Sequence, residues 1–158
     1  MNPVAIEHTT FTVERELPGS PAHAFRFWAD PKLKDRWNGC HPDWTVLEDH
    51  VDFRPGGSER KRWRTPEGDE LVFQVFYLDI LPGERIIYAY EMSFGGQRLS
   101  ASLVTIALSP HGARTRMKLT EQAAFLTGEG ASAQRIQGTE EGYDRLVAVA
   151  EQDLAEVH

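Results

Sequence analysis

The sequence predicts an α+β fold in which one curved antiparallel sheet of about seven strands wraps around a long C-terminal helix. Three observations support this prediction. Residues 44–125 form segments in which apolar and polar side chains tend to alternate, the period of a half-buried strand. Short turns rich in proline and glycine separate these segments, and such short links favour antiparallel pairing. From residue 133 onward, apolar residues recur three and four positions apart, the period of an amphipathic helix.

The N-terminal part of the chain predicts one strand and two short helices. Phe11 and Val13 alternate with polar neighbours, and Pro18-Gly19 ends that strand. Ser20-Pro21 and Asp30-Pro31 each place an N-cap residue before a proline, whose missing N–H costs nothing at the first helical position. The expected elements are a strand over residues 10–17 and helices over residues 21–29 and 31–37.

The rest of the chain predicts six more strands and one long helix. The strands are expected at residues 44–53, 57–65, 70–81, 85–94, 97–109 and 113–125. Turn residues such as Gly56-Gly57 mark the breaks between them. The helix, expected over residues 133–157, has an apolar stripe that includes Tyr143, Leu146 and Ala150. Such a stripe must be buried, and the sheet is the only partner large enough to cover it.

Size and charge exclude several classes of function. The chain has 158 residues, and we expect one domain over residues 1–158 with a core at about residues 10–155. Its formal net charge of −7 repels nucleic acids and anionic membranes. No apolar run approaches the roughly 18 residues that cross a bilayer, and no signal peptide is evident, so we expect a cytoplasmic protein. Cys40 is the only cysteine, which excludes an intrachain disulfide, and we expect neither a metal nor a cofactor.

Four passages resemble a known family when they are taken together and in order. They are Glu14-Arg15-Glu16-Leu17-Pro18 through Trp28-Ala29-Asp30-Pro31 and Trp37, then Asp52-Phe53-Arg54-Pro55-Gly56-Gly57, then Tyr77-Leu78-Asp79-Ile80-Leu81-Pro82 through Tyr88, and finally Glu141-Gly142-Tyr143-Asp144-Arg145-Leu146. The chain is similar to the family named for the C-terminal domain of the activator of the heat-shock-protein-90 ATPase. That family belongs to the SRPBCC superfamily, which shares the helix-grip fold of the birch-pollen-allergen and steroid-transfer (START) proteins. The resemblance covers about residues 10–155.

The resemblance implies a fold more strongly than an activity. Members of the superfamily include small-molecule carriers, polyketide cyclases, hydrolase-like enzymes and the chaperone co-regulator. A sheet wrapped around a helix often leaves a cavity between the two, and such a cavity favours an apolar or aromatic ligand. From strand alternation and helical spacing we expect the ligand to contact Trp37, Glu59, Lys61, Trp63, Gln74, Phe76, Tyr88, Tyr90, Met117, Glu121 and Tyr143.

Three charged residues within this set are ambiguous. Glu121 shares a strand face with apolar residues, so it is a candidate general base or ligand acceptor, unless it pairs with an arginine or lies at the cavity mouth. Glu59 and Lys61 share a face with Trp63. They form either a polar recognition element inside the pocket or the solvated end of a strand. We favour the solvated end, because burying a lone charge costs several kcal/mol.

The preferred function is a soluble small-molecule-binding protein whose ligand is hydrophobic or aromatic. An alternative is a polyketide cyclase- or hydrolase-like enzyme that uses the same cavity, with Glu121, Glu59, Lys61 and Tyr90 as its acids and bases. A second alternative is a chaperone-associated interaction module, and a homodimer is also open. A closed apolar core would favour the module, convergent charges would favour the enzyme, and an apolar pocket with one or two polar groups would favour the carrier.

Overall fold

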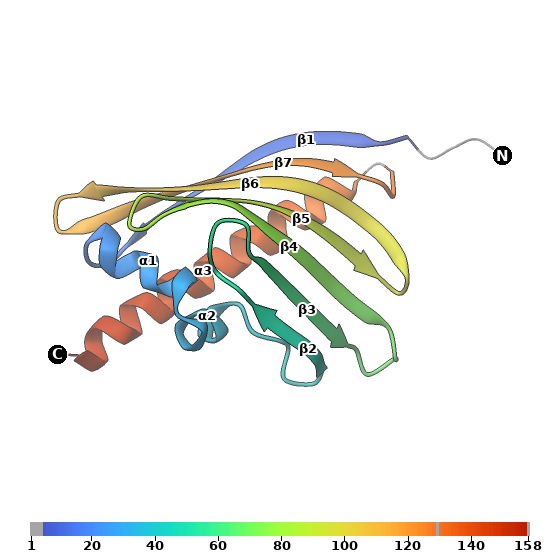
Figure 1. Ribbon diagram of the computed structural model, residues 1–158, viewed down its shortest axis with the longest axis horizontal. Helices are drawn as coiled ribbons and strands as arrows, with labels where there is room; N and C mark the ends of the chain where they lie inside the picture. Colours follow the sequence, from blue (N-terminus) through green and yellow to red (C-terminus); the bar gives the residue numbers. More distant parts are fainter. Residues whose placement is uncertain (1–4, 129, 158) are drawn as a thin grey trace.

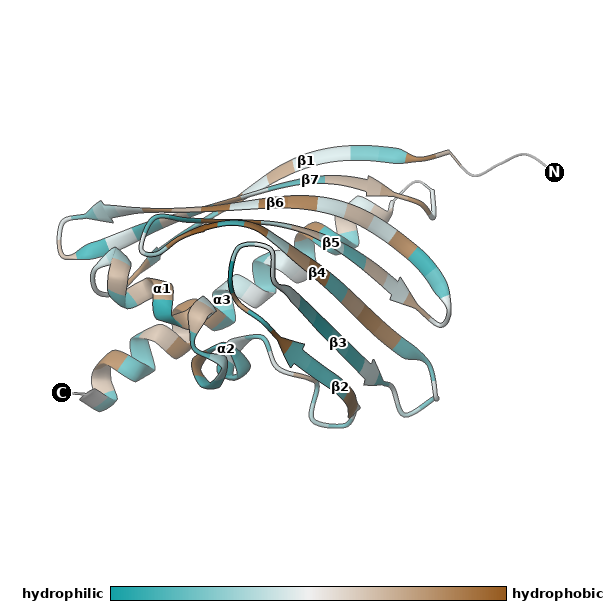
Figure 2. Ribbon diagram, in the orientation of Figure 1, coloured by the Kyte–Doolittle hydropathy of each residue, from teal (hydrophilic) through white to brown (hydrophobic). Residues whose placement is uncertain are grey.

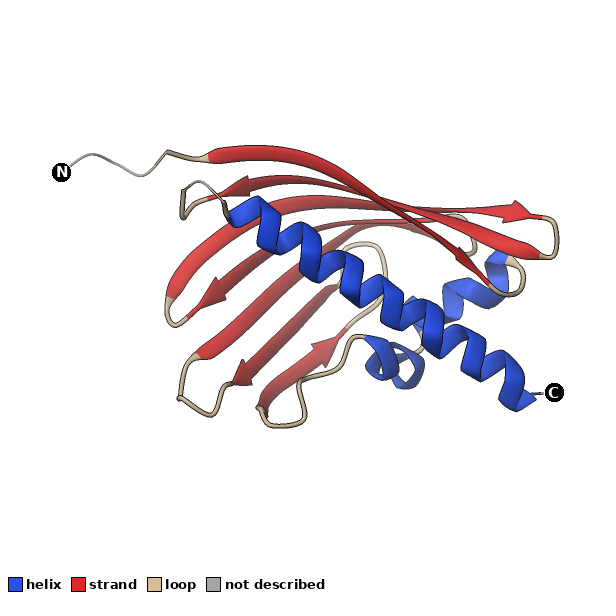
Figure 3. Ribbon diagram, turned by 180° about the vertical axis from the view of Figure 1, so that it is seen from behind, coloured by secondary structure: helices blue, strands red, loops and turns tan. Residues whose placement is uncertain are grey.

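The fold class is confirmed by the computed structural model, which describes residues 5–128 and 130–157. The elements are β1 (Glu7–Leu17), α1 (Pro21–Ala29), α2 (Pro31–Trp37), β2 (Thr45–Val51), β3 (Ser58–Arg64), β4 (Glu70–Leu81), β5 (Arg85–Phe94), β6 (Gln97–His111), β7 (Arg114–Phe125) and α3 (Ala131–Val157). The seven antiparallel strands follow the order β1-β7-β6-β5-β4-β3-β2. Helix α3 runs diagonally across one face of the curved sheet, and α1 and α2 lie beside its C-terminal half (Figures 1 and 3).

The first strand is longer than the sequence predicts. Strand β1 begins at Glu7 rather than Thr10, because it pairs with β7 along its whole length, from Glu7 opposite Phe125 to Leu17 opposite Thr115. Pairing with β7 therefore keeps residues 7–9 extended, although these residues have no apolar pattern of their own. Strands β1 and β2 form the two edges of the sheet.

The two short helices begin where their capping residues predict. The Ser20 hydroxyl accepts a hydrogen bond from the His23 amide at 3.2 Å, and the Asp30 carboxylate accepts one from the Lys32 amide at 3.0 Å. Both helices bury aromatic side chains, and Trp37 Nε1 donates to the Phe27 carbonyl at 2.9 Å. That bond fixes α2 against α1 and directs the Trp37 ring toward α3.

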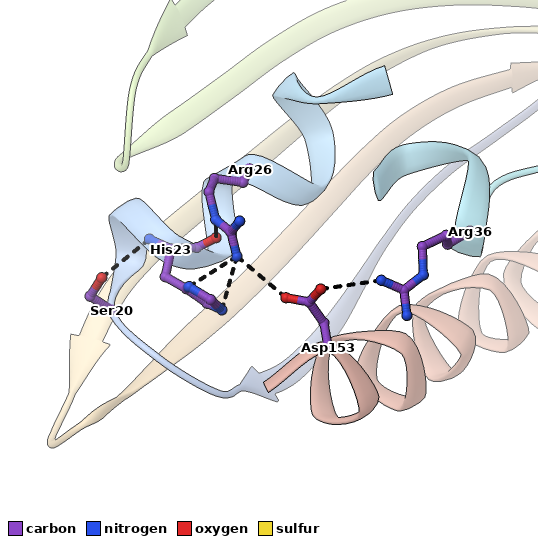
Figure 4. Close-up of polar contacts among 5 residues, drawn as sticks. All are labelled: Ser20, His23, Arg26, Arg36 and Asp153. Atoms are coloured by element: carbon purple, nitrogen blue, oxygen red, sulfur yellow. Dashed lines mark hydrogen bonds and ion pairs between the residues drawn. The ribbon is translucent and has the colours of Figure 1, made fainter. Parts of the chain in front are cut away.

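The long helix is held by a buried stripe and by ion pairs near its end. Tyr143, Leu146 and Ala150 are all buried, as predicted from their spacing. Near the C-terminus, Asp153 accepts from Arg26 of α1 at 3.4 Å and from Arg36 of α2 at 3.2 Å (Figure 4). One carboxylate thus joins all three helices. No helix among the described residues is long and apolar enough to cross a membrane.

The sequence-based prediction of which β4 residues face the interior is wrong. Leu71, Val75 and Tyr77 are buried toward α3, whereas Phe76 and Leu78 are 46% and 56% exposed on the outer face. Apolar residues lie on both faces of this strand, and β4 is coloured largely brown beside the hydrophilic β3 (Figure 2). In addition, the register shifts between Tyr77 and Asp79, so a bulge at Leu78 returns the following residues to the opposite face. Strict alternation of inward and outward side chains therefore cannot assign the faces of β4 on both sides of that bulge.

A glycine turn between β2 and β3 fixes the position of Tyr77. The Gly56 amide donates to the Tyr77 carbonyl at 2.8 Å, and the Tyr77 amide donates to the Gly57 carbonyl at 3.0 Å. Gly56 has a φ of +83°, and a Cβ atom at Gly57 would lie only 2.1 Å from the Asp52 carbonyl oxygen. A side chain at Gly56 would be strained by the positive φ, and one at Gly57 would require the backbone to shift. The turn therefore locks the backbone from which the Tyr77 phenol enters the interior.

Candidate ligand cavity

A cavity of about 370 Å³ lies between the sheet and α3. Its lining contains all four tyrosines of the chain, Tyr77, Tyr88, Tyr90 and Tyr143, and three of the four tryptophans, Trp28, Trp37 and Trp63. The small residues Gly138 and Gly142 of α3 also line it, and they leave space where larger side chains would meet the sheet. The tyrosines and tryptophans of this protein are therefore concentrated around one internal space.

The structure brings eight of the eleven expected contact residues to this cavity. They are Trp37, Glu59, Lys61, Trp63, Tyr88, Tyr90, Glu121 and Tyr143. Gln74 and Phe76 lie on the outer face of β4, for the reason given above. Met117 faces inward as expected, but it is fully buried in the packed core and does not line the cavity.

Residues from α2, β3 and β4 form a buried cluster at one part of the cavity. The Lys34 ammonium contacts the Glu59 carboxylate directly and lies 3.3 Å from the Tyr77 hydroxyl. The Tyr77 hydroxyl in turn donates to Glu59 Oε1 at 3.2 Å. Burial lowers the pKa of Lys34, while the charge of Glu59 acts in the opposite direction. Burial also raises the pKa of Tyr77, so its hydroxyl remains a donor.

The expectation that Glu59 and Lys61 reach water is wrong. Their exposed fractions are only 4% and 3%. The side chain of Lys61 ends 3.8 Å from an Asp35 oxygen of α2 and 3.7 Å from an Asp49 oxygen of β2. These contacts show that α2 covers the inner face of β3 and supplies opposite charge to both residues. Burial is tolerated because each charge has partners, a condition that one strand's sequence does not reveal.

A second buried cluster surrounds Glu121. Its Oε2 atom accepts from the Tyr90 hydroxyl at 2.8 Å, from the Ser102 hydroxyl at 2.9 Å and from Arg135 Nη1 at 3.3 Å. Arg135 also donates to Ser100 Oγ at 2.7 Å. The inward direction of Glu121 is confirmed, and of the alternatives considered, the pair with an arginine is present. Burial raises the pKa of Tyr90, and Glu121 acts in the same direction.

Sequence reasoning missed Lys34, Tyr77 and Arg135. Lys34 resembles an ordinary surface lysine, but it precedes Trp37 by three positions and so shares a helix face with it. Arg135 similarly precedes Thr139 by four positions on the face that continues to Tyr143. Helical spacing was thus the available signal for both residues. Tyr77 was missed because the inner face of β4 was misassigned. Among the described residues, no group of three His, Cys, Asp or Glu side chains could hold a metal ion.

Sequence comparison now identifies the family. The family model described as activator of Hsp90 ATPase homolog 1-like protein matches residues 18–151. The chain belongs to this family. The matched segment contains every residue of the two buried clusters, so the clusters lie within the domain that defines the Hsp90 ATPase activator homolog family.

Solved structures support the same relationship. A protein from Rhizobium leguminosarum is 42% identical with a TM-score of 0.87, and the match covers 94% of this chain and 97% of that chain. A protein from Rhizobium loti is 37% identical with a TM-score of 0.85, covering 92% and 99%. A protein from Chromobacterium violaceum, 24% identical with a TM-score of 0.72 over 90% and 96%, shows the shared fold alone. No protein with a curated description matches the chain.

Proposed function

We propose that this protein binds a small, mostly apolar aromatic molecule in the cavity between the sheet and α3. The observation that supports the proposal is the gathering of all four tyrosines around a space of about 370 Å³. Ligand sites commonly enclose about 300–1,000 Å³ and combine aromatic walls with a few polar groups. A cytoplasmic location and a homodimer stay predictions.

The polar groups of the cavity suggest how such a ligand is oriented. In both buried clusters the carboxylate uses one oxygen for its protein partners, Oε1 in Glu59 and Oε2 in Glu121. Within the described residues, the other oxygen of each carboxylate has no hydrogen-bond partner. A ligand with a donor group can therefore bond to Glu121 or Glu59 without breaking the existing contacts.

The experiment is a fluorescence titration with N-phenyl-1-naphthylamine, a neutral aromatic dye with one N–H donor. We expect close to stoichiometric binding to the folded protein. Gly138→Leu should weaken binding severalfold, because a Cβ atom there meets nothing within 4 Å and Gly138 lines the cavity. Ala148→Leu is the matched control, since Ala148 is exposed on the same helix. The proposal is wrong if the folded wild type binds no dye, or if the two variants weaken binding equally.

A second candidate function is acid–base catalysis on a ligand held in the same cavity. The observation that favours it is the convergence of Lys34, Glu59 and Tyr77, in which burial lowers the pKa of the lysine. Hydrolysis of 1-naphthyl acetate would test it. Catalysis requires turnover by the wild type that Tyr77→Phe lowers without weakening dye binding. Absence of turnover with retained dye binding supports the carrier. The open, charged interior also differs from the closed apolar core that an interaction module would favour.

A further inference from the structure

The cavity is lined by more positive than negative side chains. Among the described residues, four cations but only two carboxylates belong to its lining: Lys34, Lys61, Arg135, Arg145, Glu59 and Glu121. The chain as a whole has the opposite balance, with 17 Lys and Arg against 24 Asp and Glu. Glu59 pairs with Lys34, and the other lining carboxylate pairs with Arg135 at 3.3 Å. The positive excess of the lining therefore comes from Lys61 and Arg145.

Lys61 is a buried cation whose ion pairs are long. Its Nζ atom lies 3.8 Å from an Asp35 oxygen and 3.7 Å from an Asp49 oxygen. Both distances exceed the length of a hydrogen bond, so neither aspartate accepts one of the three N–H groups of the ammonium. Both aspartates are exposed, and water screens their charges. The ammonium can thus donate to an acceptor in the cavity without losing a hydrogen bond to either aspartate.

The positive side chains lie near the place where the cavity opens to solvent. Lys61 of β3 approaches Asp35 in α2, and Arg145 Nε of α3 donates to the carbonyl of Trp37, the last residue of α2, at 3.3 Å. The exposed members of the described lining all belong to α3 or follow α2 closely: Gly39, Gln134, Gly138 and Arg145. The mouth of the cavity therefore lies between the end of α2 and α3, which are neighbours in Figure 3.

We propose that the cavity binds an aromatic carboxylate, whose anionic group accepts hydrogen bonds from the Lys61 ammonium. The Arg145 guanidinium, at the mouth, adds to the attraction of an anion. The ring system of the ligand packs against the tyrosines and tryptophans of the cavity wall. The two lining carboxylates are already paired with cations, so they oppose the anion less than free carboxylates would. This inference rests on the proposed ligand-binding function and names the class of ligand.

The test compares three ligands that share a naphthalene ring: 2-naphthoate, the neutral 2-naphthamide and the cation 2-naphthylmethylammonium. Competition against the naphthylamine dye at neutral pH measures their affinities for the wild type. We expect naphthoate to bind roughly tenfold more tightly than naphthamide, because a hydrogen bond between opposite charges is stronger than one to a neutral acceptor. The cation should bind more weakly than naphthoate.

Two variants of β3 locate the anion. Lys61→Met removes the buried ammonium and should reduce the preference for naphthoate over naphthamide to about twofold or less. Arg64→Met is the matched control, because it removes the same charge from an exposed position of the same strand, and it should keep the preference. The affinity for naphthamide shows whether each variant still has a folded cavity.

A measurement on the wild type locates the ligand without any variant. Nuclear Overhauser contacts should join the ring protons next to the carboxylate of bound naphthoate to the side-chain protons of Lys61. These contacts decide the position of the anion even if Lys61→Met fails to fold.

The outcomes separate this inference from the proposed function. If neither the dye nor any of the three compounds binds, the proposed function fails. If naphthoate binds no more tightly than naphthamide, or if the cation binds most tightly, only the carboxylate inference is overturned. It is also overturned if Lys61→Met keeps the full preference, if Arg64→Met lowers the preference equally, or if the bound ring shows no contact with Lys61.

Discussion

The contact between Lys34 and Glu59 places two opposite charges inside the protein, with exposed fractions of 7% and 4%. Each charge is tolerated only because the other is present, together with the Tyr77 hydroxyl. Removing one partner leaves a buried charge without compensation, whereas removing both leaves an apolar contact. The two kinds of substitution should therefore have very different effects on stability.

We predict that Lys34→Met lowers the free energy of unfolding by about 3–5 kcal/mol, because it strands the Glu59 carboxylate. The double variant Lys34→Met with Glu59→Leu should recover most of that loss. Lys32→Met, at an exposed position of the same helix, is the control and should change stability by less than about 0.5 kcal/mol. Urea unfolding measures all three. A double variant as unstable as Lys34→Met alone would contradict the prediction.

For individual residues, the sequence predicted positions in the cavity wall where strand alternation or helical spacing determines the direction of the side chain, as for Tyr90, Glu121 and Tyr143. It failed where the environment of a residue is supplied by distant parts of the chain. Lys61 is buried because Asp35 and Asp49 come from two other elements to meet it. No pattern within β3 contains that information.

Among the elements, α3 contains two glycines in its interior, where glycine weakens a helix. A Cβ atom at Gly138 would meet nothing within 4 Å. We predict that Gly138→Ala raises the free energy of unfolding by about 0.5–1 kcal/mol. Gly96→Ala should do the opposite, since Gly96 has a φ of +82°. Thermal melts of the two variants should thus shift in opposite directions, and a lower melting temperature for Gly138→Ala would show that the position is not open.

The ion pairs of Asp153 join the end of α3 to the other two helices. We predict that Asp153→Asn costs less than about 1 kcal/mol of global stability, because both arginines are partly exposed. Its local effect should be larger, with faster amide hydrogen exchange in the last turns of α3. Glu156→Gln, exposed on the same helix, should leave that exchange unchanged. Equal exchange in the two variants would remove the proposed role of Asp153.

The elements themselves were predicted well because their boundaries depend on local chemistry. Capping residues before prolines defined α1 and α2, and glycine turns separated the strands. Two features were not local. The early start of β1 depends on its pairing with β7, and the bulge at Leu78 depends on the register between β4 and β5. Both are properties of strand pairs, which the pattern of a single strand does not contain.

For the molecule as a whole, the tyrosines predict a steep loss of stability at alkaline pH. Burial raises the pKa of all four above the ordinary value of 10.0. Below pH 10.0 both the folded and the unfolded chain hold these protons. Above it the unfolded chain releases protons that the folded chain keeps, so rising pH favours unfolding.

Lys34 opposes this trend, because burial lowers its pKa in the folded protein below the ordinary value of 10.5. Between the lowered pKa and 10.5 the unfolded chain holds a proton that the folded chain has released, so rising pH favours folding there. Four tyrosines outweigh one lysine, so the melting temperature should fall above pH 10.0. Tyrosinate absorbance should appear only together with unfolding. Tyr88→Phe should make the decline less steep. Tyrosinate formation in the folded protein near pH 10.0 would contradict the burial of these hydroxyls.

The pairing of β1 with β7 also determines when the chain can fold during its synthesis. Strand β1 is translated before the other described strands of the sheet, but β7, beside which it lies at the sheet edge, follows about a hundred residues later. At ~5–20 residues per second, the nascent strand waits roughly 5–20 seconds with Phe11, Val13 and Leu17 uncovered. Closing so long a loop is also entropically unfavourable. The ribosome must therefore release β7 before the sheet can be completed, so the timing of folding is governed by the translation of β7.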